Sequence, residues 1–180
     1  MSNKNWITKG AIAAAVTSVF GASAVYAESV NTTATVDIIT GFTFVETTPL
    51  NFGDIAVLKS ISVGTDVTVT MNETSGARTT SDATEVALLA GGGETRLVLD
   101  ASAAPPFTAM TVTIPDTTAL TVGTNPDIVM SALTEDAGGT TTDAGGALNL
   151  TYGATLIFSN SETYGAGTYT GPFTVTLDFN

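Results

Sequence analysis

Acidic side chains are the most abundant ionisable groups in this sequence that could do chemistry. The chain has 17 Asp and Glu residues, and a pair of carboxylates can hydrolyse a glycosidic bond. No particular pair is marked by spacing or by nearby aromatic residues, since the only tryptophan is Trp6 near the N-terminus. Histidine and cysteine are absent, which excludes Ser-His-Asp and Cys-His arrangements and thiolate metal sites. We therefore expect no enzyme, with no catalytic, cofactor-binding or metal-binding residues.

Two glycine-rich segments could bind a ligand in principle. Residues 91–95 read Gly-Gly-Gly-Glu-Thr and lack the lysine and the following helix of a phosphate-binding loop, so we expect a turn between two strands. Residues 136–146 contain Asp-Ala-Gly-Gly twice, and carboxylates beside glycine turns suit calcium. Their spacing matches neither the EF-hand loop nor the Gly-Gly-x-Gly-x-Asp repeat. A solvated loop is the preferred interpretation, with calcium as the alternative.

The elements that position these loops are expected to be β-strands. β-Branched residues are frequent, and Gly, Pro, Asn and Asp separate the runs that they form. Several runs alternate between apolar and polar side chains, as strands with one buried face do. The expected strands are 30–39, 66–71, 85–89, 96–100, 110–114, 119–122, 127–133, 147–158 and 172–180. We find no convincing helix after residue 27, so the pattern predicts an all-β fold and favours a β-sandwich over an open sheet.

The first 27 residues are expected to be a signal peptide. Lys4 and Lys9 precede an apolar stretch at 11–25, and Val25-Tyr26-Ala27 has the small-residue pattern of a cleavage site. The stretch is shorter than the roughly 20 residues of a membrane span. We therefore expect the mature chain to begin at Glu28, to contain no membrane span, and to be exported through the periplasm to the cell surface or the extracellular space.

Removal of this leader would leave a strongly acidic chain. The 17 acidic residues would then be opposed by Lys59, Arg78 and Arg96, for a net charge of 3 − 17 = −14. Such a surface repels phosphate backbones and anionic lipids, so we expect no nucleic-acid partner. No Pro-rich or charged linker divides the remainder, and residues 41–180 are expected to form one domain.

Two parts of the chain resemble a known family. The C-terminus, Gly165-Ala-Gly-Thr-Tyr-Thr-Gly-Pro-Phe-Thr-Val-Thr-Leu-Asp-Phe-Asn180, resembles the closing strand of chaperone-usher pilins and spore-coat-U-type domains. In that family a glycine lies fourteenth from the end and an aromatic residue is penultimate, as Gly167 and Phe179 are here. Residues 35–42 and Leu50-Asn-Phe-Gly53 look like the donor strand and first strand of archaic-type pilins. They are also similar to an uncharacterised group of bacterial secreted domains. Phe42 stands where pilins often have a cysteine, so the family's disulfide is absent.

The resemblance implies an immunoglobulin-like β-sandwich that lacks one strand and is completed by donor-strand exchange. Residues 28–40 would be the donor segment, whose inserted side chains would be those of Val30, Thr32, Ala34, Val36 and Ile38. The closing strand and its chaperone contact would comprise Gly167, Tyr169, Phe173, Val175, Leu177 and Phe179. Phe173, Val175, Leu177 and Phe179 also form the longest alternating apolar face in the sequence, which we expect to be buried.

These features lead to two hypotheses about function. In the first, the chain is a structural subunit of a bacterial surface fimbria or coat with a role in adhesion or biofilm. Its implied partners are identical subunits, a periplasmic chaperone and an outer-membrane usher. In the second, residues 29–39 pair within their own chain, and the protein is a secreted monomeric module that binds surface polysaccharide. The same alternation suits both, so the sequence leaves them open.

Overall fold

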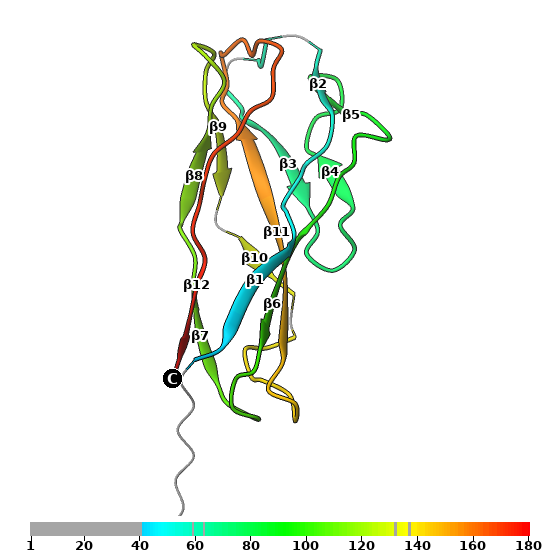
Figure 1. The fold of residues 1–180 in the computed structure, drawn as a ribbon. Coiled ribbons are helices and arrows are strands. Elements are labelled where there is room, and N and C mark those ends of the chain that lie inside the picture. Colours follow the sequence, from blue (N-terminus) through cyan, green and yellow to red (C-terminus); the bar gives the residue numbers. More distant parts are fainter. Residues whose placement is uncertain (1–40, 59, 63, 132, 137) are drawn as a thin grey trace, which may run out of the picture. The chain divides into compact units, whose positions relative to one another are not determined.

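The computed structural model describes residues 41–180 except 59, 63, 132 and 137. The described residues form strands and turns, without any helix, and therefore without a helix able to cross a membrane. They belong to one compact unit, Ile38–Asn180 (Figure 1). The expected all-β fold is confirmed. The expected signal peptide and donor segment, including Val30, Thr32, Ala34, Val36 and Ile38, lie outside the described residues.

Twelve strands occur in this part of the chain, and most of them are short. In order they are β1 (Thr43–Thr48), β2 (Ile55–Val57), β3 (Val67–Met71), β4 (Arg78–Thr80), β5 (Val86–Leu88), β6 (Leu97–Ser102), β7 (Met110–Thr113), β8 (Thr117–Leu120), β9 (Ile128–Ser131), β10 (Thr134–Glu135), β11 (Leu148–Phe158) and β12 (Thr176–Phe179). Local side-chain hydrogen bonds form the turns between them. In the β3–β4 turn, for example, Asn72 Oδ1 accepts the backbone N–H groups of Thr74 and Ser75 at 3.1 and 2.8 Å.

All of the strand pairs are antiparallel. The largest sheet has eight strands, in which β1, β6, β11, β3 and β4 are successive neighbours, β10 and β9 also pair with β11, and β8 pairs with β9. β12 with β7 and β2 with β5 form two-stranded sheets. Isolated bridges extend these ladders at Asn51–Thr95, Ala109–Thr141 and Thr121–Thr170.

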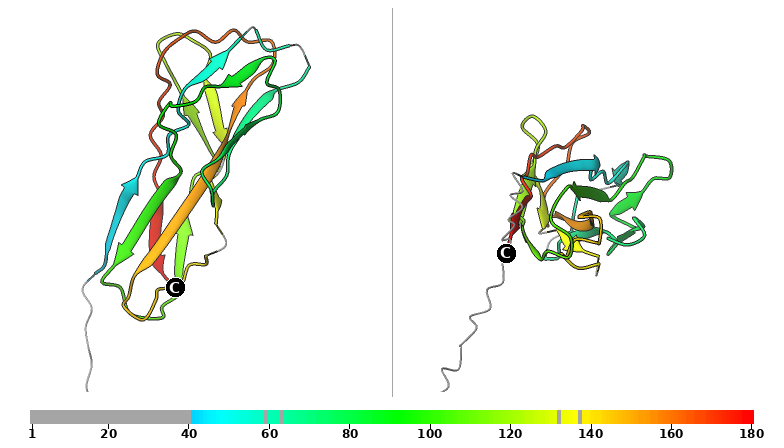
Figure 2. Two further views of the ribbon diagram at one scale, coloured as in Figure 1. Left: turned by 90° about the vertical axis from the view of Figure 1, so that its right-hand side faces the viewer. Right: turned by 60° about the horizontal axis from the view of Figure 1, so that its bottom comes forward.

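β11 connects the two halves of the largest sheet. Its first half, up to Tyr152, pairs with β6, and its second half, from Ala154, pairs with β3 and β9 (Figure 2). Gly153 lies at the change of partner, where a β-carbon would overlap the backbone oxygen of Met71. Glycine is therefore required at this point because a neighbouring backbone passes directly over β11.

Alternating side chains from these sheets enclose one core. In β3, Val67, Val69 and Met71 are buried, whereas Thr70 is exposed. β11 is buried along most of its length, as is typical of a strand with neighbours on both sides. The same core receives side chains from β5, β6, β7, β9 and β12, and each fully buried aliphatic or aromatic side chain contributes about 1.5–3 kcal/mol.

Most of the expected strands are found with modified bounds, and four unexpected ones appear. Strands β3, β5, β6, β7, β9 and β11 match the expected runs, and β8 begins two residues earlier than predicted. The closing strand is shorter than predicted, because its ladder with β7 covers only Thr176–Phe179. The unexpected strands are β1, β2, β4 and β10, whose residues do not alternate regularly between apolar and polar side chains. Four of the six residues of β1 are exposed, so no alternating apolar face marks this strand in the sequence.

Tyr152 and Tyr164 offer a test of how buried hydroxyl groups affect stability. The Tyr152 side chain is fully buried, and its hydroxyl has no hydrogen-bond partner among the described residues. The Tyr164 hydroxyl accepts the Ser159 N–H at 2.7 Å. An unsatisfied buried polar group costs about 1–3 kcal/mol. We therefore expect Tyr152→Phe to preserve or raise the free energy of unfolding, and Tyr164→Phe to lower it by about 1 kcal/mol. Equal losses in chemical denaturation would contradict this assignment.

Candidate functional site

Two sheet edges lie on either side of unfilled space in this unit. β1 pairs with β6 on one side only. Residues 164–175, here called the closing segment, run beside β8 and lead into β12, which pairs with β7 (Figure 1). Within the described part of the chain, no strand pairs with the other side of β1 or of the closing segment. Both edges therefore leave backbone hydrogen-bonding groups available for a further strand.

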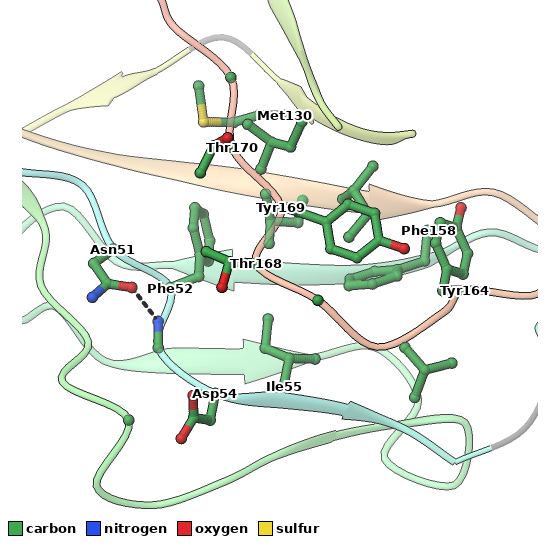
Figure 3. Close-up of a pocket in the computed structure, with 18 of the residues that line it drawn as sticks. Asn51, Phe52, Asp54, Ile55, Met130, Phe158, Tyr164, Thr168, Tyr169 and Thr170 are labelled. Carbon is green, nitrogen blue, oxygen red and sulfur yellow. Dashed lines mark hydrogen bonds between the residues drawn. The ribbon is translucent and has the colours of Figure 1, made fainter. Parts of the chain in front are cut away.

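The larger of two cavities between these edges has a volume of about 850 Å³. One wall is formed by Leu50–Val57 and the other by Tyr164–Gly171, with Phe173 beyond it. Core side chains of β9 and β11, including Met130 and Phe158, form its floor (Figure 3). Protein interiors seldom contain voids larger than a water molecule, so this core lacks side chains that would complete its packing.

A second cavity of about 470 Å³ continues the first towards the start of β1. Its walls are Phe44–Glu46 and Gly171–Val175, and Leu97 and Leu99 of β6 also line it. The two cavities share Gly171 and Phe173. Together they form one groove, called the strand groove below, that follows β1 and β2 on one side and the closing segment on the other.

The first wall of the strand groove is held by the Leu50-Asn-Phe-Gly53 segment. The backbones of Asn51 and Thr95 exchange two hydrogen bonds of 2.8 Å. The Asn51 side chain accepts the Gly53 N–H at 2.8 Å (Figure 3) and donates to the Gly93 oxygen at 3.1 Å. Gly53 has a φ of +66°, a conformation that glycine adopts without strain. This side-chain turn gives a physical reason for the Asn-x-Gly spacing.

Arg78 of β4 fixes the same wall from behind. Its side chain is 5% exposed and lies 3.2 Å from the Glu94 carboxylate. It donates to three backbone oxygens, those of Phe52 at 2.6 Å, Asp54 at 3.1 Å and Leu89 at 2.8 Å. A guanidinium group can satisfy several carbonyls at once because its donors point in fixed directions. Arg78 therefore ties the groove wall to β4 and to the end of β5.

Glycines allow the closing segment to lie close against its neighbours. A β-carbon on Gly167 would lie 2.7 Å from a Val122 methyl carbon, and one on Gly171 would overlap the Ala119 oxygen. These contacts give a structural reason for the glycine that the sequence placed fourteenth from the end. They also keep the segment against β8, away from β1, which leaves the strand groove open.

Aromatic side chains line the far end of the strand groove. Tyr164 makes edge contacts with Phe158 and Tyr169, with ring centroids 5.3 and 6.4 Å apart. The Tyr169 hydroxyl donates to the Gly165 oxygen at 3.1 Å. Burial raises the pKa of the Tyr164 phenol above its ordinary value, so this hydroxyl stays neutral at physiological pH.

The structure brings together four of the six residues predicted for the closing strand. Gly167, Tyr169 and Phe173 line the larger cavity, and Phe173 and Val175 line the smaller one. Leu177 is 6% exposed and belongs to the core.

The prediction of a fully buried apolar face was wrong for Phe179, which is 44% exposed. It lies at the end of β12, where its ring makes an edge contact with Phe42 at 5.0 Å. A strand end has no neighbouring layer to cover both sides of a large ring. Leu50, Ile55 and Val57 of the first wall were not among the predicted site residues.

The acidic residues of the 136–146 segment have partners within the protein. Asp143 Oδ1 accepts the Ala147 and Gly145 N–H groups, both at 2.8 Å, and these bonds lower the pKa of its carboxyl group. Asp136 accepts the Thr74 hydroxyl at 3.0 Å. In the described ranges no group of three acidic residues is placed to hold a metal ion. Asp143 therefore shapes a tight turn in this structure.

Residues 42–179 match the family model of a domain of unknown function, DUF4402. The chain belongs to the DUF4402 family. The matched region contains both walls and the floor of the strand groove, whereas residues 28–40 precede it. No curated protein and no solved structure matches this DUF4402 chain. Its function is therefore argued from the groove.

Proposed function

We propose that the strand groove receives residues 28–40 of a second copy, and that the chain is a structural subunit of a bacterial surface fimbria or coat. The observation that carries this proposal is the groove itself. It is bordered on one side by the free edges of β1 and β2 and on the other by the closing segment, and no described strand lies between them. A peptide that adds to such an edge gains main-chain hydrogen bonds, and pockets select its alternate side chains.

The predicted donor segment has the form that such a groove requires. Val30, Ala34, Val36 and Ile38 alternate with polar residues and no proline interrupts them. Residues 30–38 would extend over roughly 27 Å in a strand. Each apolar side chain buried in the groove would contribute about 0.8–3 kcal/mol, in addition to the ladder hydrogen bonds.

Insertion into a second copy would generate a polymer. A head-to-tail contact of this kind joins two different surfaces and does not close, so subunits can add without limit. The proposal includes an immunoglobulin-like sandwich completed by the donated strand, export through the periplasm, and assembly by a chaperone and an usher, all of which derive from the resemblance to pilins. A role in adhesion or biofilm belongs to the same proposal.

Two single substitutions in the donor segment test the proposal. Val36→Asp places a charge on the face that would enter the groove, where an unpaired buried charge is strongly unfavourable. Thr35→Asp adds the same charge on the opposite face. We expect Val36→Asp to abolish polymers in size-exclusion chromatography and Thr35→Asp to retain them. Equal polymer formation by the two variants would refute strand donation.

A monomeric saccharide-binding module is the second candidate. The larger cavity, at about 850 Å³, lies within the range of roughly 300–1,000 Å³ that is typical of small-molecule sites. Tyr169, Asn51 and Asp54 among its lining residues could contact a sugar. This function predicts a monomer in sedimentation experiments whose melting temperature rises with an oligosaccharide. A polymer that no oligosaccharide stabilises would exclude it.

A further inference from the structure

Phe107 is the most exposed large apolar side chain among the described residues. Its side chain is 73% exposed, and its backbone has a φ of +53°. Bulky residues rarely adopt this left-handed conformation, which persists only where the surrounding structure enforces it. Ala103, in the same loop, has a φ of +62°. The loop at 103–109 therefore has a strained backbone conformation, and this conformation exposes the Phe107 ring to solvent.

The surrounding structure holds this loop firmly. The Phe107 N–H donates to the Asp143 oxygen at 3.2 Å. Thr142 is 2% exposed, and its hydroxyl donates to the Pro105 oxygen at 2.6 Å and accepts the Thr108 N–H at 2.8 Å. These bonds anchor both sides of Phe107. An aromatic ring held in advance loses little conformational entropy on binding, which favours its use as a recognition anchor.

The loop lies at the end of the unit where β1 begins. Thr43 pairs with Ser102, and Met110 pairs with Phe179, whose ring contacts Phe42. The starts of β1 and of the loop at 103–109 are therefore at one end, as Figure 1 also shows. A segment donated from residues 28–40 would bring this end against the subunit that accepts it.

Charge also favours this end as a contact surface. Acidic side chains are few at this end: Asp143 lies in the turn beside Phe107 and Asp178 lies in β12, whereas residues 101–115 and 144–161 contain no charged side chain. The loops at the other end of β11 include Asp66, Asp127 and Glu162. An end with few acidic side chains meets less repulsion from the acidic end of an identical subunit than a second strongly acidic end would.

We propose that Phe107 is a docking anchor for a second copy of this chain. Phe107 of the subunit that donates the N-terminal strand would contact the subunit that accepts the strand. This inference rests on the proposed function and adds a second contact to it. The donated strand connects two subunits, and the contact of the Phe107 loop fixes the orientation of one subunit relative to the other. The contact would stiffen the junction and lower the subunit concentration required for polymerisation.

The absence of cysteine allows a direct test with single introduced thiols. Ala144→Cys places a thiol in the exposed turn beside Phe107, and Ala77→Cys places one in the exposed β3–β4 turn. In the polymer we expect the first thiol to react with a maleimide at least about tenfold more slowly than in the monomer, because contacts around an anchor exclude solvent. The second thiol should react equally in both states.

Substitution of the ring itself gives an independent measurement. Phe107→Ser should raise the concentration for half-maximal polymerisation about tenfold, equivalent to about 1.4 kcal/mol, whereas Phe107→Tyr should behave as wild type. A polymer with a freely reactive 144 thiol and an unaffected Phe107→Ser variant would overturn this inference alone. Absence of polymers from the wild-type chain would overturn both proposals. Protection of the 144 thiol in the monomer by a soluble oligosaccharide would assign Phe107 to sugar binding.

Discussion

Mixing two variants that cannot polymerise alone should produce dimers and no longer species. The first variant is Val36→Asp, which has an intact groove and a defective donor segment. The second is Thr168→Trp. Thr168 is exposed and lines the larger cavity, as does Phe52 of the opposite wall (Figure 3), so an indole at position 168 would occupy the space that a strand requires. This second variant can donate a strand and cannot accept one.

The expected dimer follows from the two unlike surfaces of a head-to-tail contact. Each mixed pair would use the one working donor and the one working groove, and no further subunit could add. Multi-angle light scattering after chromatography would measure the mass. Thr79→Trp, on an exposed position of β4 outside the groove, serves as the control and should polymerise normally. Monomers only in the mixture, or polymers from Thr168→Trp alone, would contradict exchange through this groove.

Arg78→Met should destabilise the domain by about 3 kcal/mol or more. The substitution removes a buried guanidinium that donates to the Phe52, Asp54 and Leu89 oxygens. Hydrogen bonds to charged groups contribute about 1.5–3 kcal/mol each, and the partly buried Phe52 oxygen that loses its donor adds a desolvation cost. Methionine keeps most of the side-chain volume, so the loss would report the polar contacts. The melting temperature should fall by roughly 6–12 °C.

Arg96 provides a matched control for Arg78. Its guanidinium donates to one backbone oxygen, that of Glu73 at 3.2 Å, so Arg96→Met should cost about 1.5 kcal/mol, the lower end of the range for one such bond. Glu94→Gln should also have a small effect, because the Glu94 side chain is 35% exposed and surface ion pairs contribute little. Differential scanning calorimetry of the three variants would rank them. Equal losses for Arg78→Met and Arg96→Met would show that Arg78 does not hold the groove wall.

The strand content of this protein could be predicted from local pattern alone. Val67, Val69 and Met71 alternate with threonines in the sequence. In strand β3 these three apolar side chains are buried and the threonines between them are more exposed. Such prediction works because successive side chains of a strand point to opposite faces. When one face is buried, every second residue must therefore be apolar. It failed for β1 and β4, which lie at sheet edges, because exposed positions accept almost any side chain.

The strand groove could be identified only from the tertiary structure. The sequence by itself determined that Gly167, Tyr169, Phe173 and Val175 belong to one closing segment, and it excluded chemistry based on histidine or cysteine. It contained no sign that this segment lies across a cavity from Leu50–Val57, more than 100 residues earlier in the chain. The burial of Arg78 and the exposure of Phe107 and Phe179 were equally hidden. Burial at these positions is decided by which distant segments come together in space, whereas local periodicity reports only which face of a strand is apolar.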